Sequence, residues 1–454
     1  MKKFLLPAIL TLCVQLAMSQ DLKKVETAVV LKKMEDAKTE VDKAVADPKN
    51  QEKPEAWYWK ARIYAALAND PALRTKYPGA LAEANTAYQK YATLDPTFAV
   101  AKQKGAEGLF DAYAASFAEG TKAFNDKKWE EAGAAFTRSN DYINTIIKNK
   151  WTNANIAFDT TGLLYAGYAY QNAKKPEMAS KYYSVLADNK VAGENYLDVY
   201  RYLSNYYLES KNEAQFKKYI AVAGQIYPKE PWEDYEMEYV DRNLTADEKI
   251  AAYDRDDAAG SLSEYKYLAF GDIFSKAKND KSLDSAKQQW YAIKAAEAFK
   301  KAYAKNNQNA TAAFNVGVTY YNIYVDYDDR YAANIRAMQA INSEAKPEKD
   351  PKKKAAADAA LKAKTDPYRQ ANANIEKPLM DNLDMSIEWL EKSYNILKGK
   401  PARSNTEKNV INKDVDFLAN LYAYKRDRVR AKDPKAFDAY DAKYKEYDAL
   451  HSKF

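Results

Sequence analysis

Among the side chains of this sequence that could take part in catalysis, carboxylates are the most numerous. They are densest in an acidic stretch from Glu230 to Asp257, where Asp and Glu alternate with aromatic residues. Two carboxylic acids that flank a glycosidic bond can hydrolyse it, one as an acid and the other as a base or nucleophile. On a single helix, however, the same alternation describes a buried aromatic face and a solvated acidic face. We expect this second arrangement for Glu233, Asp234, Glu236, Glu238 and Asp241 beside Trp232, Tyr235 and Tyr239.

A second group of acids, Asp326, Asp328 and Asp329, could suggest a calcium site. The spacing lacks the glycine turn and the distal bidentate glutamate of an EF-hand loop. We therefore interpret the three residues as the charged end of a helix. No glycine-rich phosphate loop or dinucleotide-binding fingerprint occurs anywhere in the sequence.

Histidine and cysteine are almost absent from the chain. The sequence has one cysteine, Cys13, and one histidine, His451, which is the fourth residue from the end. Zinc sites of Cys and His, Ser-His-Asp triads, Cys-His nucleophiles and haem ligation by His all require more of these residues. The sequence therefore predicts a protein without a metal, without a cofactor and without enzymatic activity.

The N-terminus has the features of a secretory signal. Lys2 and Lys3 precede an apolar run over residues 4–16, which is too short to span a bilayer, and small residues follow before Gln20. Lipoprotein processing at Cys13 is the competing interpretation, but the residue before a lipidated cysteine is normally small and here is leucine. We expect residues 1–19 to be a signal peptide. The mature protein would be periplasmic or secreted after cleavage near Gln20, with no transmembrane segment.

The composition favours an all-α protein with short connections. Hydrophobic residues make up 47% of the 454 residues, but only 13 residues are glycine, which α/β enzymes use in tight turns and ligand loops. The formal net charge is only +6, so it gives no reason to expect binding to nucleic acid.

A recurring spacing of residues predicts helices that pack in pairs. On the first helix of a pair, a small residue is followed three places later by an aromatic residue. About twelve places after the small residue comes a position on the second helix, and an apolar residue follows it four places later. Steps of three and four keep residues on one helix face, and the small residue lets two helices approach closely. The spacing occurs at Gly167, Tyr170, Ala179 and Tyr183, at Ser204, Tyr207, Phe216 and Ile220, at Gly120, Ala132 and Phe136, at Trp57, Ala61, Tyr64, Ala84, Tyr88 and Pro96, at Gly271, Phe274, Ala295 and Phe299, and at Gly317, Tyr320, Ser386, Leu390 and Ser393.

In this spacing the chain resembles the tetratricopeptide repeat (TPR) family. The family pattern of Trp, small residue, Tyr, Ala, Phe and terminal Pro is matched best between Trp57 and Pro96. Phe216 departs from it, because the family usually has alanine there. The resemblance implies an all-α, TPR-like α-solenoid of about six to eight helical hairpins with a C-terminal capping hairpin.

The expected organisation follows from where the spacing is present and where it is lost. We expect an N-terminal helix over residues 20–53, repeats over 54–229, a degenerate hairpin over 230–262, further repeats over 263–403 and capping helices over 404–454. The second set of repeats contains a basic insertion near residues 342–378, which holds Lys352, Lys353, Lys354 and a run of alanine between prolines 347, 351, 367 and 378. A solvated, partly helical excursion is expected there; a basic docking arm for an acidic partner is the alternative.

The resemblance also implies a function. Such repeats are interaction scaffolds, so a protein or peptide partner in the cell envelope is expected. The chain is similar to exported Bacteroidota repeat proteins, and since helical repeats of those bacteria also capture glycans, a glycan-binding protein is the alternative. A carboxylate-only glycoside hydrolase is a more remote one.

Groove positions carried over from the family pattern define the candidate binding residues. Arg201 and Asn205 are favoured, because they lie one turn apart on one face and have little packing reason to be there. The arginine could grip a carboxylate of the partner. The full set is Tyr58, Arg62, Phe117, Thr121, Tyr168, Asn172, Arg201, Asn205, Phe314, Tyr321 and Asn322.

Overall fold

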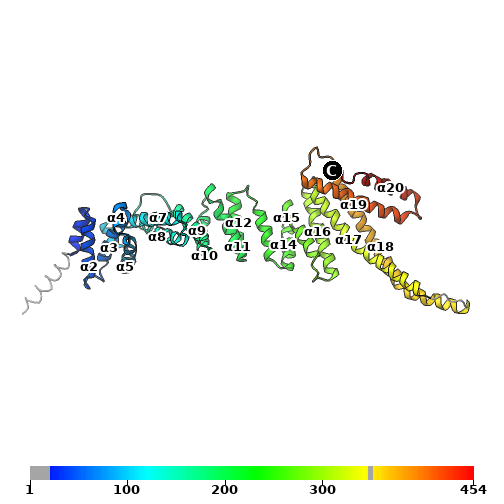
Figure 1. Ribbon diagram of the computed structural model, residues 1–454, viewed down its shortest axis with the longest axis horizontal. Coiled ribbons are helices and arrows are strands. Elements are labelled where there is room, and N and C mark those ends of the chain that lie inside the picture. Colours follow the sequence, from blue (N-terminus) through cyan, green and yellow to red (C-terminus); the bar gives the residue numbers. More distant parts are fainter. Residues whose placement is uncertain (1–20, 346–350) are drawn as a thin grey trace, which may run out of the picture. The chain divides into compact units, whose positions relative to one another are not determined.

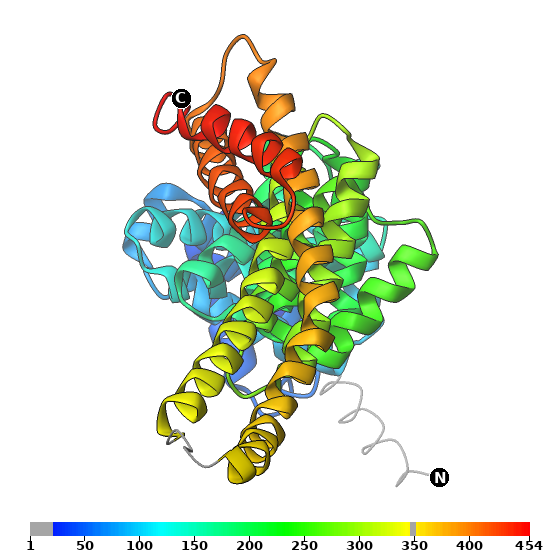
Figure 2. The same cartoon turned by 90° about the vertical axis from the view of Figure 1, so that its right-hand side faces the viewer.

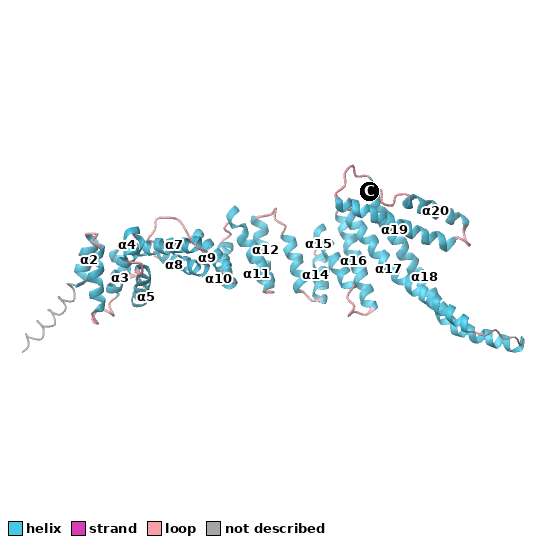
Figure 3. Ribbon diagram, viewed as in Figure 1, coloured by secondary structure: helices cyan, strands magenta, loops and turns pink. Residues whose placement is uncertain are grey.

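The computed structural model describes residues 21–345 and 351–454. Every regular element in these two ranges is a helix and none is a strand (Figure 3), which confirms the all-α expectation. The expected signal peptide, with Cys13, lies outside the described residues.

The chain forms two compact units, the first ending at Trp232 and the second beginning at Glu233. Figure 1 labels most of their helices. After a helix over residues 21–30, the first unit contains α2 (Met34–Ala46), α3 (Pro54–Asn69), α4 (Pro71–Lys76), α5 (Ala80–Leu94), α6 (Ala99–Lys104), α7 (Glu107–Asn125), α8 (Trp129–Lys148), α9 (Thr160–Asn172), α10 (Pro176–Asp188), the 3-10 turn η1 (Glu194–Tyr196), α11 (Leu197–Glu209) and α12 (Glu213–Ile226). The second unit contains α13 (Trp232–Asn243, apart from its first residue), α14 (Ala246–Ala258), α15 (Glu264–Lys278), α16 (Ser285–Lys305), α17 (Ala310–Glu344), α18 (Pro351–Lys398), α19 (Asn405–Val429) and α20 (Pro434–Asp448).

Helices that follow one another in sequence pack together in pairs. Within a pair, α7 packs on α8, α9 on α10, α11 on α12, α15 on α16, α17 on α18 and α19 on α20. Contacts then pass to the next pair, from α8 to α9, from α10 to α11, from α16 to α17 and from α18 to α19. Each unit is therefore built from sequential helix pairs, an arrangement consistent with helical repeats.

Close approach of two helices explains the glycines of the repeated spacing. A Cβ atom added to Gly167 would lie 2.4 Å from the ring of Tyr183, which is the residue that the spacing places opposite it. An added Cβ atom would also lie close to the partner side chain at three other glycines. The distances are 2.4 Å from Gly271 to Phe299, 2.6 Å from Gly317 to Leu390 and 2.8 Å from Gly120 to Phe136. The helix register predicted from the spacing is thus confirmed at these four pairs.

Lysine, rather than glycine, supplies the left-handed residue at several helix ends. After α9, Lys174 has a φ of 57°, its N–H donates to the carbonyl of Gln171, and the next N–H, that of Lys175, donates to Tyr170. This is the Schellman arrangement, in which glycine is the usual residue. The positive φ recurs at Lys32, Lys127, Lys150, Lys190 and Lys211. The low glycine content therefore does not reflect a lack of tight turns. Lys32 lies in one of these turns. Residues 20–53, which were expected to form one N-terminal helix, therefore contain two helices.

The basic insertion is helical wherever the structure describes it. Helix α17 continues to Glu344 and α18 begins at Pro351, and the two lie side by side (Figure 2). Pro367 and Pro378 lie inside α18, so the excursion, expected to be solvated and partly helical, is helical to a greater extent than expected. Asp326, Asp328 and Asp329, expected at a helix end, likewise lie within α17.

We call residues 332–344 and 353–371 of α17 and α18 the helical arm. None of its apolar side chains is fully buried, and Thr365 is its one buried residue. At the base of the arm, the amide of Asn334 donates to the side-chain oxygen of Asn372, at 2.7 Å. The arm is therefore helical but contributes little to the core.

The last two helices, α19 and α20, form the C-terminal hairpin. Its start at Ser404 is a capping box, in which the serine and Glu407 each accept from the other's backbone N–H. Inside the hairpin core, Asp414 of α19 is fully buried and one of its oxygens accepts from the Ser393 hydroxyl, at 2.7 Å. The other oxygen has no hydrogen-bond partner. Burial raises the pKa of Asp414 well above its usual range, although the bond from Ser393 opposes this.

Candidate functional site

A groove of about 900 Å³ opens on the first unit, lined by residues of α7, α9, η1 and α11 and by Tyr183 of α10. Helices α7, α9 and α11 are the first helices of successive pairs. Asp159 caps the start of α9 by accepting from the N–H of Gly162, and from there residues 161, 164, 165, 168 and 171 recur at helical spacing along the groove. Residues 198, 201, 202 and 205 do the same on α11. Two helix stripes, one on α9 and one on α11, thus supply most of the groove lining.

Aromatic rings form much of the groove wall. Tyr165 and Tyr168 are 40% and 47% exposed, which is unusual for such large side chains in this protein. Their rings pack on Phe124 of α7, with ring centres 5.6 and 5.7 Å apart. Across the groove, Tyr202 packs edge-on against Tyr183, at 5.1 Å. The rings are held by packing and still present area to the groove.

Amide side chains provide the neutral polar groups of the groove. The Gln171 oxygen accepts from the Tyr183 hydroxyl, at 2.9 Å, so its NH2 group is left to donate elsewhere. Asn195 and Asn205 are exposed, and within the described residues their side chains make no hydrogen bond. These amides can supply donors and acceptors to a bound molecule.

The charges of the groove are mainly acidic. Arg201 is its one cation, and the guanidinium contacts Asp198 at 3.1 Å and Glu230 at 2.5 Å. The hydrogen bond to Glu230 raises the pKa of Arg201 above its ordinary value. Glu194 is exposed and has no ion-pair partner among the described residues. The arginine expected to grip a carboxylate of the partner is therefore already held by two carboxylates of its own chain.

Three of the candidate residues predicted from the sequence meet in this groove: Tyr168, Arg201 and Asn205. Asn172 lies on the same helix but outside the groove, and its amide donates to the carbonyl of Tyr168, at 2.8 Å. It helps to close the C-terminal end of α9 instead of facing a ligand.

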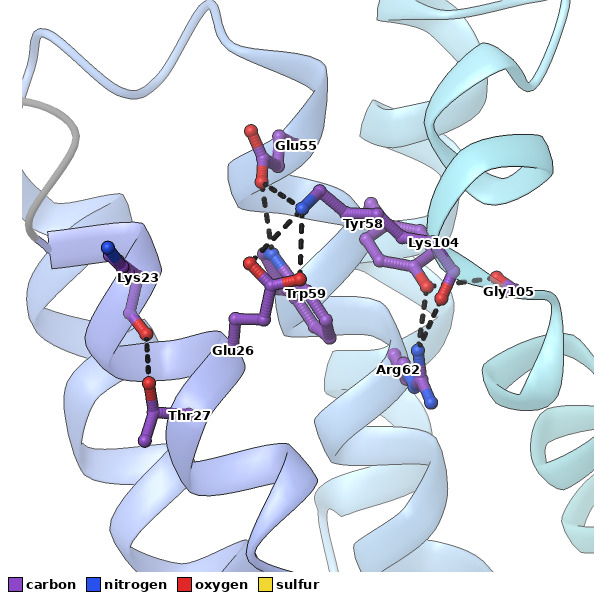
Figure 4. A network of polar contacts seen from close by, with 9 residues as sticks. All are labelled: Lys23, Glu26, Thr27, Glu55, Tyr58, Trp59, Arg62, Lys104 and Gly105. Carbon is purple, nitrogen blue, oxygen red and sulfur yellow. Dashed lines mark hydrogen bonds and ion pairs between the residues drawn. The ribbon is translucent and has the colours of Figure 1, made fainter.

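Tyr58 and Arg62 are not available to a ligand, which corrects the expectation for this pair. Tyr58 is 3% exposed and its hydroxyl donates to the carbonyl of Gly105, at 2.9 Å. Arg62 donates to the Tyr58 hydroxyl oxygen and to the carbonyl of Lys104, both at 2.9 Å (Figure 4). The end of α6 thus covers this face of α3, and the two side chains hold it there. Lys104 is itself paired with Glu26 and Glu55, at 3.1 and 3.2 Å.

The remaining candidates mostly pack between helices. The Phe117 ring contacts Phe136 at 5.3 Å, and the Thr121 hydroxyl donates to the Phe117 carbonyl within α7. The rings of Phe314 and Tyr321 contact Phe417 of α19, at 6.4 and 4.6 Å, so the C-terminal hairpin covers them. Asn322 is exposed beside a smaller hollow of about 220 Å³ in the second unit, away from any aromatic wall like that of the groove.

Several groove residues were missed by the sequence reasoning. They are Tyr165, Gln171, Glu194, Asn195, Tyr196, Asp198 and Tyr202. For Tyr165, Gln171, Asp198 and Tyr202, a spacing of three from Tyr168, Arg201 or Asn205 was the signal that could have found them. Glu194, Asn195 and Tyr196 form the 3-10 turn η1 and do not have this spacing.

Most acids of the stretch from Glu230 to Asp257 contact cations or hydroxyls. Asp241 lies 3.2 Å from both Lys249 and Lys276, and Glu236 pairs with Lys266. Glu238 pairs with Arg242 within α13, at 2.9 Å. Trp232 and Tyr239 are buried beside them. This arrangement matches the expected buried aromatic face and solvated acidic face.

The described residues also contain no group of three or more His, Cys, Asp or Glu side chains placed to hold a metal ion. No helix in the same part of the chain is both long enough and apolar enough to cross a membrane.

Comparison with known proteins adds no family to this description. No protein-family model matches the sequence, and a search of the curated proteins finds no match.

Proposed function

We propose that this chain is a non-enzymatic TPR-type scaffold that binds an extended peptide segment of a protein partner in the groove of α7, α9 and α11. The observation that supports it most is that first helices of successive pairs line one groove with exposed tyrosines and unpaired amides. A peptide backbone presents N–H and C=O groups that Gln171, Asn195 and Asn205 can satisfy. Tyrosine rings add contact area at little cost in conformational entropy.

The place of this binding is proposed to be the cell envelope, outside the inner membrane of a Gram-negative bacterium. The proposal is supported by the basic and apolar residues before Gln20. N-terminal sequencing of the native protein checks it: a first residue near Gln20 is expected, whereas a retained Met1 or an acylated Cys13 contradicts it.

A double variant, Tyr168→Ala with Asn205→Ala, tests the groove. Both side chains are exposed, so the variant should unfold within a few degrees of the wild type. The matched control is Asn172→Ala, which removes an exposed amide from α9 outside the groove. Mass spectrometry of material co-purified from the native envelope should show partners with the wild type and the control. Partners that remain on the well-folded double variant would place the binding site elsewhere.

Glycan binding is the second candidate, and the exposed side chains of Tyr165 and Tyr168 favour it. Aromatic faces with flanking amides and acids also suit sugar rings, and Asn195 and Glu194 lie in the same groove. A glycan array separates the two candidates: binding of an oligosaccharide that Tyr165→Ala abolishes would favour the glycan.

A further inference from the structure

The groove charge determines which peptides it can accept. Asp198 and Glu230 occupy the Arg201 guanidinium, so an incoming carboxylate would have to displace one of them. The side chain of Asp198 is 86% exposed, and the contact with Arg201 leaves most of the carboxylate open to the groove. Glu194, one helical turn before it, has no ion-pair partner among the described residues. A cation therefore meets two accessible acids there, whereas an anion meets no free positive group.

The tyrosine rings of the groove have a second distinguishing feature. Elsewhere in this protein the chain's own cations cover tyrosine rings, as Lys300 does over Tyr320 at 4.7 Å and Arg330 over Tyr327 at 4.5 Å. No lysine or arginine in the described part of the chain lies over the groove rings, Tyr165, Tyr168, Tyr196 and Tyr202. The faces of aromatic rings attract cations. One face of Tyr165 stacks on Phe136 and one face of Tyr202 stacks on Tyr206. Tyr165 and Tyr168 are nevertheless exposed to the groove, so their uncovered surfaces can receive a cation of a ligand.

We propose that the groove selects a basic peptide segment, with a lysine or arginine side chain over its tyrosine rings and the charge of that side chain paired with Glu194 and Asp198. This inference rests on the proposed peptide-binding function. The charge proposed for the ligand is the opposite of the one that Arg201 suggests when the sequence is considered alone, since a free arginine would favour an acidic ligand.

Selection from a phage-displayed library of random dodecapeptides tests the preference. The library is selected in parallel on the full-length wild type and on Tyr168→Ala/Asn205→Ala. Peptides recovered only on the wild type depend on the groove, and they should contain lysine and arginine well above their frequency in the library, and aspartate and glutamate below it. Groove-dependent peptides without this enrichment overturn the basic preference alone. If no groove-dependent peptide is recovered, the proposed peptide-binding function fails as well.

The acids are tested with one enriched peptide, synthesised and fluorescently labelled. The variant Glu194→Gln/Asp198→Asn keeps the shapes of both side chains and removes both charges. The control, Glu130→Gln/Glu131→Gln, removes two exposed charges from the first turn of α8, outside the groove. At low salt the first variant should bind about tenfold more weakly, with a flatter dependence on salt, and the control should bind like the wild type. Unchanged affinity in the first variant, or an equal loss in both, overturns the inference.

Discussion

At Gly167 the second helix of its pair comes so close that the ring of Tyr183 occupies the space a side chain would need. The Tyr183 ring is buried and its hydroxyl is bound to Gln171, so it has little freedom to move away. This contact is the residue-level basis of the repeated spacing. It was predictable because a step of sixteen residues between a glycine and an aromatic residue fixes which helix positions face each other across a short turn.

The variant Gly167→Ala measures this contact. Overpacking should cost about 1–3 kcal/mol and the better helix propensity of alanine should return about 1 kcal/mol, so the free energy of unfolding should fall by up to about 2 kcal/mol. The matched control is Gly224→Ala in α12, where the new Cβ would lie 3.8 Å from the nearest atom, of Trp232, an ordinary contact. The control should be neutral or stabilising in urea denaturation. Equal effects at the two positions would mean that the predicted register is wrong.

Asp414 predicts a pH dependence. Because burial raises its folded-state pKa, the folded protein keeps the proton at pH values where the unfolded chain has lost it. Its contribution to stability is therefore fully present below about pH 4 and decreases as the pH rises, by up to about 1.4 kcal/mol per pH unit. In Asp414→Asn no proton is released, so the stability of this variant relative to the wild type should increase with pH. Urea denaturation between pH 4 and 8 checks this; a difference that stays constant with pH contradicts it.

Candidate site residues were predictable only where the repeat pattern continues on both sides. Tyr168, Arg201 and Asn205 lie on first helices whose neighbours also follow the pattern, and the groove remains open there. Tyr58 and Arg62 occupy equivalent helix positions, but α6 interrupts the pattern and its end covers them. No residue in the short segment before α7 shows the repeat spacing, so this cover could not be inferred from the sequence.

At the scale of helices, the prolines of the basic insertion were misleading. Proline removes one backbone donor and usually ends or kinks a helix, yet Pro367 and Pro378 lie within α18. Pro378 lies beside Leu379 and Leu383, which are fully buried where α18 packs along α17. At this proline the lost hydrogen bond is outweighed by helix–helix packing, which the local sequence does not reveal.

Removing the helical arm should leave the second unit folded. In the deletion, residues 337–369 are replaced by a short Gly-Ser linker, and the contact between Asn334 and Asn372 is kept. Among the removed residues whose burial the structure describes, Thr365 is the one that is buried, so the midpoint of thermal unfolding should change by only a few degrees.

A longer deletion provides the contrast. If it extends inward to remove Tyr324 and Leu379, both buried, cooperative unfolding of the second unit should be lost. Circular dichroism during heating measures both variants. Loss of cooperativity already in the shorter deletion would show that the arm is part of the core.

For the whole molecule, the order of the helix pairs was predictable and the division into units was not. The repeat spacing reports contacts between neighbouring helices, and residues 230–262 lack it. The boundary between Trp232 and Glu233 falls in that segment. A stretch of sequence without the repeat spacing could be a degenerate helix pair or a boundary between two units. Only the contacts between helices in the structure distinguish these possibilities.

Each unit is expected to fold by itself, because contacts in helical repeats are made with neighbours. Residues 21–232 and 233–454, produced separately, should both be helical and unfold cooperatively in urea. Their unfolding curves should together account for that of the full chain. A fragment that is unfolded alone but folded in the full chain would show that the units depend on each other.

The lysines in the left-handed turns also mark positions where a protease is expected to cleave the chain. Trypsin cleaves after lysine, and a protease needs an extended substrate, which a turn can provide with less unwinding than a helix interior. Lys127, Lys174 and Lys211 lie between the helices of successive pairs, and Lys150 and Lys190 follow the second helices. Partial tryptic digestion should therefore divide the first unit close to its helix boundaries, so that the pieces released correspond to single helices and pairs of helices.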